Sequence, residues 1–178
     1  MKKNFSILLI LIICFTAIKG FAYEIKPGPY LGFKGGMFTG HHINSTDIIS
    51  IGGIAGYTLP FNNNFFKAAI EVEYNFGNYG GDYVSGAAGN RLHIRTLGGY
   101  CVIRTLPVND LYTKLKIGVT HEVSIERLSD IETSSSEIGP SLGIGVGFRA
   151  SEKINYEFGF STTNSGLKFF SLNFHLLI

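Results

Sequence analysis

The chain has 178 residues, a formal net charge of +2, and many glycines (23), phenylalanines (15) and tyrosines (9) but no tryptophan. A charge so near zero provides no basic field, so nucleic acid is excluded as an expected partner. Beyond residue 22 no apolar run reaches the roughly 18 residues that mark a membrane-spanning helix, which excludes helical membrane spans.

The first 22 residues have the features of a secretory signal peptide. A short positive start, Met1–Asn4, precedes an apolar run over 5–18, and small residues stand just before the expected cleavage between Ala22 and Tyr23. The apolar run is too short to cross about 30 Å of hydrocarbon as a helix. We therefore expect residues 1–22 to be removed.

The remaining residues, 23–178, are enough for one ordinary domain. They contain one cysteine, Cys101, so no disulfide within the processed chain is expected, although an exported protein could keep one.

Apolar and polar residues alternate with a period of two in eight segments, which predicts eight β-strands. In chain order these segments are about 30–38, 48–59, 66–76, 91–104, 112–122, 138–149, 154–161 and 167–178. The clearest is the third, FKAAIEVEYNF, in which Ile70 and Val72 fall on one face and Glu71 and Glu73 on the other. Its length is close to the about 9–11 residues of a tilted transmembrane strand.

The fourth segment is less regular than the others. Leu92 and Ile94 alternate with His93 and Arg95, so we expect the apolar pair on the outer face and the basic pair inside. The glycine pair at 98–99 predicts a β-bulge that can reverse the alternation beyond it. The facing of the second half of this segment is therefore left open.

The connections between segments alternate in character. Compact, turn-like stretches occur at 60–65, 105–111 and 150–153. Longer polar stretches rich in Gly, Ser, Thr and Asn occur at 39–47, 77–90 and 123–137, while 162–166 is short. Short turns at one end and longer loops at the other are typical of an even-stranded membrane barrel.

Glycines indicate which face points inward, because nine of them share the polar face: Gly32, Gly36, Gly52, Gly56, Gly118, Gly143, Gly145, Gly147 and Gly159. On a solvated exterior there is room for larger side chains, whereas the interior of a narrow eight-stranded barrel is crowded and favours small residues. The predicted fold is all-β, an eight-stranded antiparallel up-and-down transmembrane β-barrel, and a soluble secreted barrel or sandwich is the alternative.

The chain resembles the small outer-membrane β-barrel family of opacity proteins, the OmpA transmembrane domain and OmpX-like proteins. The resemblance rests on the signal peptide, the eight strands, the GxGxGF pattern at Gly143–Phe148, and a terminal strand with Phe174, Leu176 and Ile178. It implies a barrel over 23–178 in the bacterial outer membrane. Outer-membrane lipid and the barrel assembly machinery are then its expected partners.

Charged residues on the inward face predict a salt-bridge network that fills the lumen, because an unpaired buried charge costs several kcal/mol. A narrow polar pore for small solutes is the alternative. The predicted lumen residues are Lys34, Lys67, Glu71, Glu73, Arg95, Lys114, Lys116, Glu122, Arg149 and Glu157.

No catalytic, metal or cofactor site is predicted. The lipid A deacylase family carries His and Ser together near the end of its penultimate strand, and here Ser161, Asn164 and Gly166 have no histidine beside them. Without an imidazole, Ser161 has no evident base to activate its hydroxyl. The adjacent His41 and His42 supply at most part of a metal site.

We therefore expect a non-enzymatic barrel with a structural role, or one that binds an extracellular or host protein through its loops. A small-solute pore is the second reading, and a lipid A-modifying enzyme is a less favoured third. The two longest connections, 77–90 and 123–137, are the expected contact regions, since binding residues gather on loops held by a rigid scaffold. The candidate contact residues are Tyr79, Tyr83, Glu126, Arg127 and Asp130.

Overall fold

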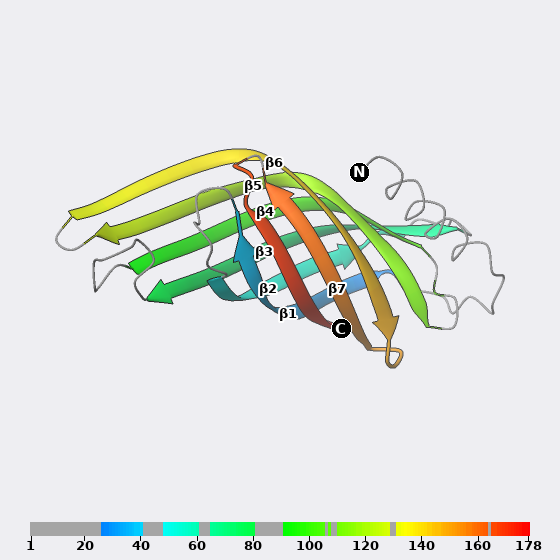
Figure 1. Cartoon of the computed structure of the whole chain (residues 1–178). Coiled ribbons are helices and arrows are strands. Elements are labelled where there is room, and N and C mark those ends of the chain that lie inside the picture. Colours follow the sequence, from blue (N-terminus) through cyan, green and yellow to red (C-terminus); the bar gives the residue numbers. More distant parts are fainter. Residues whose placement is uncertain are drawn as a thin grey trace, which may run out of the picture.

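The computed structural model describes residues 26–40, 48–60, 65–80, 91–105, 107, 110–128, 131–163 and 165–178. They form eight strands: β1 (Gly28–Thr39), β2 (Ile48–Thr58), β3 (Phe66–Gly80), β4 (Arg91–Thr105), β5 (Leu111–Leu128), β6 (Ile131–Arg149), β7 (Ile154–Thr163) and β8 (Lys168–Leu177). Each strand pairs antiparallel with the next, and β8 pairs with β1, so the sheet closes into a barrel (Figure 1). This confirms the predicted fold class.

The start of the chain is not part of this description. The expected signal peptide and its cleavage residues, Ala22 and Tyr23, lie outside the described residues, so processing stays a prediction. Among the residues that are described, no helix is long and apolar enough to cross a membrane.

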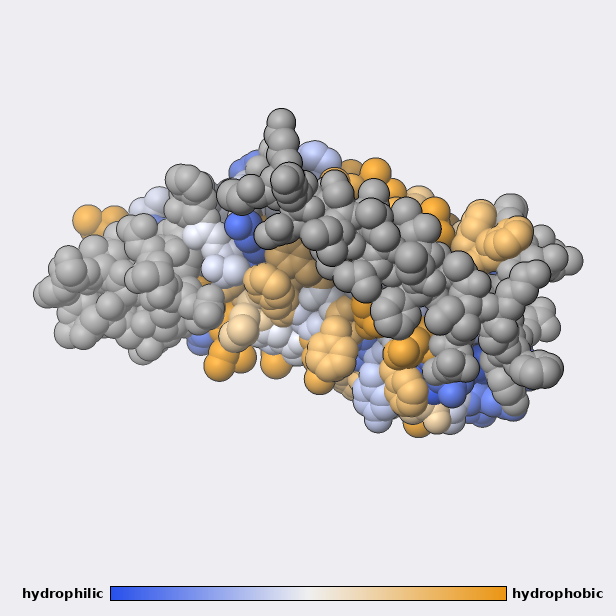
Figure 2. All heavy atoms as spheres, turned by 45° about the vertical axis from the view of Figure 1, so that its right-hand side comes forward, coloured by the Kyte–Doolittle hydropathy of each residue, from blue (hydrophilic) through white to orange (hydrophobic). Residues whose placement is uncertain are grey.

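The barrel is apolar outside and polar inside. On β3, Ile70 and Val72 are 52% and 50% exposed, whereas Glu71 and Glu73 are 0% and 1% exposed. The other strands repeat the pattern, and apolar side chains reach much of the visible described surface in Figure 2. A continuous apolar surface of this extent is unfavourable in water and fits the lipid-facing band of a membrane barrel.

Strand β4 departs from the prediction. Leu92 and Ile94 are buried inside the barrel and Arg95 is exposed outside, so the predicted inward position of Arg95 is wrong. The pairing with β3 runs without interruption past Gly98 and Gly99, so the expected bulge does not occur. The inward position of Leu92 and Ile94 follows from an apolar cluster that they complete inside the barrel with Phe38, Ile48, Leu167 and Phe169.

Strands β5 and β6 are longer than predicted. Their pairing continues from Val123 opposite Ser136 to Leu128 opposite Ile131, so residues 123–128 and 131–137 are paired strands and not the predicted loop. Strand β7 joins β6 only from Ser141 onward, which leaves residues 131–140 paired on one side among the described strands. The β5–β6 hairpin, residues 123–137, therefore extends beyond the barrel and reaches farthest to the left in Figure 1.

The hairpin forms because antiparallel pairing satisfies backbone groups that a loop would leave to water. Strand β3 likewise continues to Gly80, so the first residues of the predicted loop 77–90 belong to a strand and the rest lie outside the described residues.

Candidate functional site

An ion cluster fills the half of the lumen nearest the short turns. Arg104 donates from Nε to Glu157 at 3.0 Å and from Nη2 to Glu71. Lys114 Nζ donates to Glu71 Oε2 at 2.8 Å and to Glu157 Oε2 at 2.9 Å. The four buried side chains come from β3, β4, β5 and β7, and their two positive and two negative charges cancel. This mutual pairing offsets the cost of burying them.

A second group of charges lies one inward position farther along β3, toward the loops. Glu73 accepts from Lys34 Nζ at 2.6 Å and from Lys116 Nζ at 2.7 Å. The two ammonium groups also face aromatic rings, Lys34 at 4.4 Å from the ring centre of Phe169 and Lys116 at 4.2 Å from that of Tyr100. Cation–π contacts of this kind are favourable where the ammonium is desolvated.

Tyrosine hydroxyls complete the first ion cluster. Tyr30 donates to Glu71 at 2.6 Å, and Tyr112 donates to Glu157 at 2.9 Å. The ring of His175 stacks on Tyr30 with their centres 5.4 Å apart. Each carboxylate thus has several donors, as buried carboxylates require.

Inward glycines provide the space for these long side chains. A Cβ at Gly56 would collide with the Tyr30 ring, and one at Gly147 would collide with the Tyr112 ring. A side chain at Gly143 would meet the aliphatic part of Lys116. The small residues of the inward face therefore lie where the interior is most crowded.

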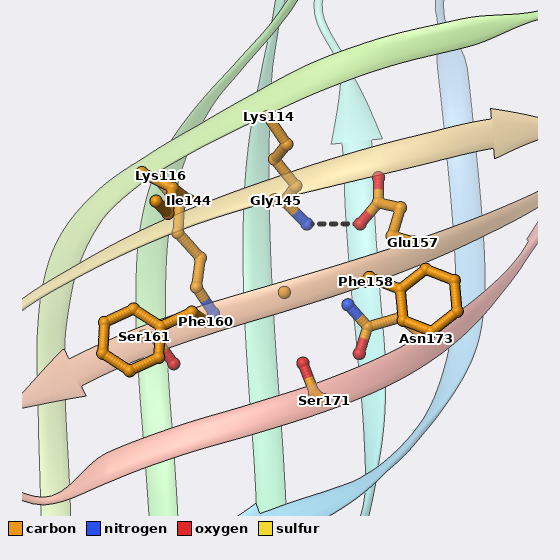
Figure 3. Close-up of a pocket in the computed structure, with 11 residues that line it drawn as sticks. Lys114, Lys116, Ile144, Gly145, Glu157, Phe158, Phe160, Ser161, Ser171 and Asn173 are labelled. Atoms are coloured by element: carbon orange, nitrogen blue, oxygen red, sulfur yellow. Dashed lines mark hydrogen bonds and ion pairs between the residues drawn. The ribbon is translucent and has the colours of Figure 1, made fainter. Parts of the chain in front are cut away.

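The lumen is closed by apolar side chains above the charges. Asn75 donates to Thr96 at 3.0 Å, and the cluster around Phe38 and Leu92 fills the next level toward the loops. A cavity beside Lys114 and Glu157 has a volume of about 10 Å³, space for about one water molecule (Figure 3). Charged groups, polar side chains and the apolar cluster therefore occupy successive levels of the lumen.

The predicted lumen residues occupy four kinds of position. Lys67 and Arg149 are buried inside near the turns, Glu122 faces inward at the loop end, and Arg95 is outside. Glu122 accepts from Ser165 at 2.7 Å and from Thr163 at 3.3 Å, away from the two ion groups. Those two groups bring together Lys34, Glu71, Glu73, Lys114, Lys116 and Glu157.

Sequence reasoning missed the roles of Arg104, Tyr30, Tyr112 and His175 in the ion cluster. The bulge predicted at 98–99 leaves the facing of Arg104 open. Continuing the predicted alternation of β4 without a bulge would place it outside with Leu92 and Ile94, so Arg104 is found inside only because the whole strand faces the other way. Tyr30 alternates in step with Lys34, and Tyr112 in step with Lys114. This alternation is the sequence signal that places both tyrosines inside the barrel.

A cavity of about 160 Å³ opens at the loop end of the barrel. Its floor is apolar, with Leu92, Ile94 and Leu167, and its walls carry the side chains of Glu122, Glu126, Glu137, Ser124, Ser135 and Ser165. The wall residues lie on the inward face of β5 and β6, except Ser165, which lies between β7 and β8. This end of the barrel is therefore acidic on its inside.

The predicted contact residues are divided between different faces. Glu126 lines the loop-end cavity, whereas Arg127 points outward and forms an exposed ion pair of 3.0 Å with Glu132. Tyr79 lies within β3, and Tyr83 and Asp130 lie outside the described residues.

The position of Ser161 is relevant to the enzyme alternative. Ser161 is buried on the inward face of β7, opposite Phe169, whereas the inward His175 pairs with Asn155. Six residues along the strand separate the two positions, a distance of about 20 Å. Asn164 and the pair His41 and His42 lie outside the described residues. Within the described ranges, no group of three or more His, Cys, Asp or Glu side chains could hold a metal ion.

Known proteins with the same architecture were found by sequence family and by structure. A family model described as "Outer membrane protein beta-barrel domain" matches residues 6–176. No curated protein sequence matches the chain significantly.

Three solved structures illustrate the likeness. Neisserial surface protein A (NspA) has a TM-score of 0.61 at 12% identity, over 84% of this chain and 96% of that one. Ail, the attachment invasion locus protein of Yersinia pestis, has a TM-score of 0.57 at 10% identity, over 86% and 100%. The outer membrane enzyme PagL has a TM-score of 0.51 at 12% identity, over 84% and 99%. At such identities the likeness establishes the fold alone.

Proposed function

This chain belongs to the outer-membrane β-barrel family and lies in the bacterial outer membrane, and from that premise we propose that it is a non-enzymatic surface protein. Its β5–β6 hairpin contacts extracellular molecules, and the barrel with its paired charges is the rigid support. An extracellular or host macromolecule is the proposed partner.

The extension of the hairpin beyond the barrel carries this proposal. Residues 131–138 are all exposed, and backbone pairing with β5 keeps them ordered as a strand without burial. An ordered segment loses less conformational entropy on binding than a flexible loop does. Its position at the loop end, opposite the short turns, is the side of a membrane barrel that faces outward.

Two structural relatives support a surface role by analogy. NspA is named as a surface protein, and Ail is named for attachment and invasion. Ail has also been solved in complex with the heparin analogue sucrose octasulfate, with a TM-score of 0.56 to this chain. That complex concerns Ail alone. For this chain, heparin serves as a probe of attachment.

The position of Ser161 supports the non-enzymatic part of the proposal. PagL is an enzyme with the same fold, so the fold is compatible with catalysis. Here the Ser161 hydroxyl points into a filled lumen, and the described inward histidine is about 20 Å away along the strand. A lipid substrate approaches from the outer face of a barrel, which this hydroxyl does not reach.

The pore alternative has less support, since paired charges and an apolar cluster occupy the lumen along much of its length. An eight-stranded barrel is only wide enough for its side chains to fill it.

Shortening the hairpin tests the proposal. Glu122 and Glu137 are directly opposite each other, so an Asn-Gly turn can join them in place of the residues between. Bacteria that display the shortened or the intact protein are compared for attachment to heparin, to immobilised matrix glycoproteins and to cultured cells. We expect the intact protein to attach and the shortened one to lose attachment while remaining a folded outer-membrane barrel.

A matched control keeps the hairpin length and neutralises its exposed ion pair, as Arg127→Gln with Glu132→Gln. It separates loss of the hairpin from a change of surface charge. Equal attachment by the shortened and intact proteins, or no attachment by the intact protein to any of the three, would overturn the proposal.

A further inference from the structure

The two ion groups of the lumen carry unequal charge. The first is balanced, because its two cations face two carboxylates. In the second, the ammonium groups of Lys34 and Lys116 share the single carboxylate of Glu73. The other inward carboxylates of the described strands lie around the loop-end cavity. The middle of the lumen therefore contains four cationic side chains and three carboxylates, and a buried charge without a counter-charge is costly.

Lys116 borders the small cavity of Figure 3, which has a volume of about 10 Å³. Gly159 forms part of the wall, and we call this space the Gly159 cavity. Ser161, Ser171 and Asn173 also line it. In Figure 3 the side chains of Lys116, Ser171 and Asn173 point toward the same space. The cavity thus joins the ion group that has the extra positive charge to three uncharged polar side chains.

These three uncharged side chains form no hydrogen bond to another described residue. Two of them are almost completely buried, since Asn173 is 4% exposed and Ser161 is 8% exposed. The amide oxygen of Asn173 is buried without a partner. Buried polar groups in proteins are nearly always hydrogen-bonded, to protein or to a bound molecule, so these side chains indicate a ligand in the cavity.

Two of the polar groups converge on one point above Gly159. A Cβ atom at this glycine would lie 3.1 Å from Ser171 Oγ and 3.7 Å from Asn173 Nδ2. A hydroxyl and an amide nitrogen can both donate a hydrogen bond. Gly159 leaves room at this point, where a bound atom is close to two donors of β8 and to the ammonium group of Lys116.

We propose that the Gly159 cavity binds a halide ion, which is chloride under natural conditions, between Lys116, Ser171 and Asn173. The ion compensates the extra positive charge and accepts hydrogen bonds from the polar side chains. The cavity has room for about one water molecule, so it is too small for sulfate or phosphate. A water molecule would satisfy the polar side chains but leave the extra charge uncompensated, and this difference favours the ion.

The carboxylate of Glu157 also borders the cavity, but its charge is already compensated. Its Oε1 accepts from Arg104 at 3.0 Å and from Tyr112 at 2.9 Å, and its Oε2 accepts from Lys114 at 2.9 Å. A halide on the Lys116 side of the cavity therefore meets a carboxylate that two cations neutralise.

Urea unfolding of the full-length processed protein tests the proposal in solution. The protein is folded into lipid vesicles in sodium bromide, or in sodium sulfate of equal ionic strength. An ion that binds only the folded state raises the ratio of folded to unfolded protein, about tenfold when its free concentration is about ten times its dissociation constant. We expect bromide to stabilise the unmodified protein in this way.

Substitutions of Ser171 separate this binding from general effects of the two salts, which act on all variants alike. Ser171→Asp places a carboxylate in the cavity, with glycines opposite it on both neighbouring strands. The carboxylate takes the place of the ion, so the specific response to bromide should disappear. Ser171→Ala removes one donor and should weaken the response. Ser50→Ala is the matched control, because Ser50 is a buried inward serine outside the cavity, and this variant should respond fully.

Crystals of the protein folded in bromide locate the ion through the anomalous scattering of bromine. We expect a peak in contact with Lys116, Ser171 and Asn173. The absence of a peak there, with water in its place, would overturn the proposal. A peak without stabilisation in solution would mean binding at crystal concentration only and would also refute it. Equal responses to bromide by the unmodified protein, Ser171→Asp and Ser171→Ala would show a general salt effect and no site.

Discussion

Glu73 on β3 and Lys34 on β1 form a buried ion pair of 2.6 Å, although 39 residues separate them in the chain. The two strands are not neighbours in the sheet, because β2 lies between them. The two side chains therefore meet over the inward face of β2, which the inward curvature of the sheet allows.

Removal of the Glu73 charge should destabilise the barrel strongly. Glu73→Gln leaves the buried ammonium groups of Lys34 and Lys116 without their carboxylate, and losing one partner of a buried pair costs about 3–5 kcal/mol. Urea unfolding in lipid vesicles measures the change. Glu132→Gln, in the exposed pair with Arg127, should change stability by about 0–1 kcal/mol. Similar small losses in both variants would contradict the structural role of the buried pair.

A charge introduced on the outer face should be costly in proportion to its depth. Val72 is near the middle of the outward apolar residues from Phe66 to Phe76, which form the lipid-facing band of β3, so Val72→Arg should cost roughly 2–4 kcal/mol. Asn78 is outward and beyond the band, so Asn78→Arg should cost about 0–1 kcal/mol. The same unfolding measurement compares them, and equal costs would argue against the proposed depth of β3.

The thiol of Cys101 reports directly on which face of β4 meets lipid. Cys101 is exposed, between Ile70 and Ile117 on the neighbouring strands. In vesicles it should react readily with an apolar maleimide and slowly with a charged, membrane-impermeant thiol reagent. Unfolding in urea should make both reagents react. Fast labelling of the folded protein by the charged reagent would place Cys101 in water and not in lipid.

Filling the space of an inward glycine should be unfavourable. A Cβ at Gly147 would collide with the ring of Tyr112, so Gly147→Ala should destabilise by about 1–3 kcal/mol through overpacking. Gly35 has nothing within 4 Å of the equivalent position. Gly35→Ala should therefore be neutral or slightly stabilising, and thermal unfolding of the two variants measures the contrast.

The closed lumen should prevent ion flow. We expect no stable large conductance when the purified protein is inserted into planar bilayers, because charged pairs and the apolar cluster occupy the interior. A single-step, long-lived conductance in both the unmodified protein and the Glu73→Gln variant would favour the pore alternative.

Much of the fold could be predicted because a period of two separates the two faces of most strands. The facing of Ile70 and Glu71 follows from alternation alone, and inward glycines show which face is crowded. Strand β4 could not be read in this way, since Leu92 and Ile94 are apolar and yet inward. Their facing depends on an apolar cluster to which β1, β2 and the segment entering β8 contribute, and no local pattern contains this cluster.

The candidate sites were harder to predict than the strands. Which charges meet across the lumen depends on the stagger between strands, so Arg104 could not be matched with Glu157 from their separate segments. The hairpin was missed because its serines are typical of a loop, and pairing between Ser124 and Ser135 is visible only in the register. The outward position of Arg95 became evident only when the parity of β4 was known.

The ion cluster of the lumen also has a consequence for the cooperativity of unfolding. Glu71 and Glu157 connect β1, β3, β4, β5 and β7 through shared donors, so detaching any one of these strands exposes unmatched charges on the others. Backbone amides in the turn half of the barrel should therefore exchange their hydrogens as one slow unit. Those of the β5–β6 hairpin at residues 131–136, which are exposed, should exchange earlier and independently.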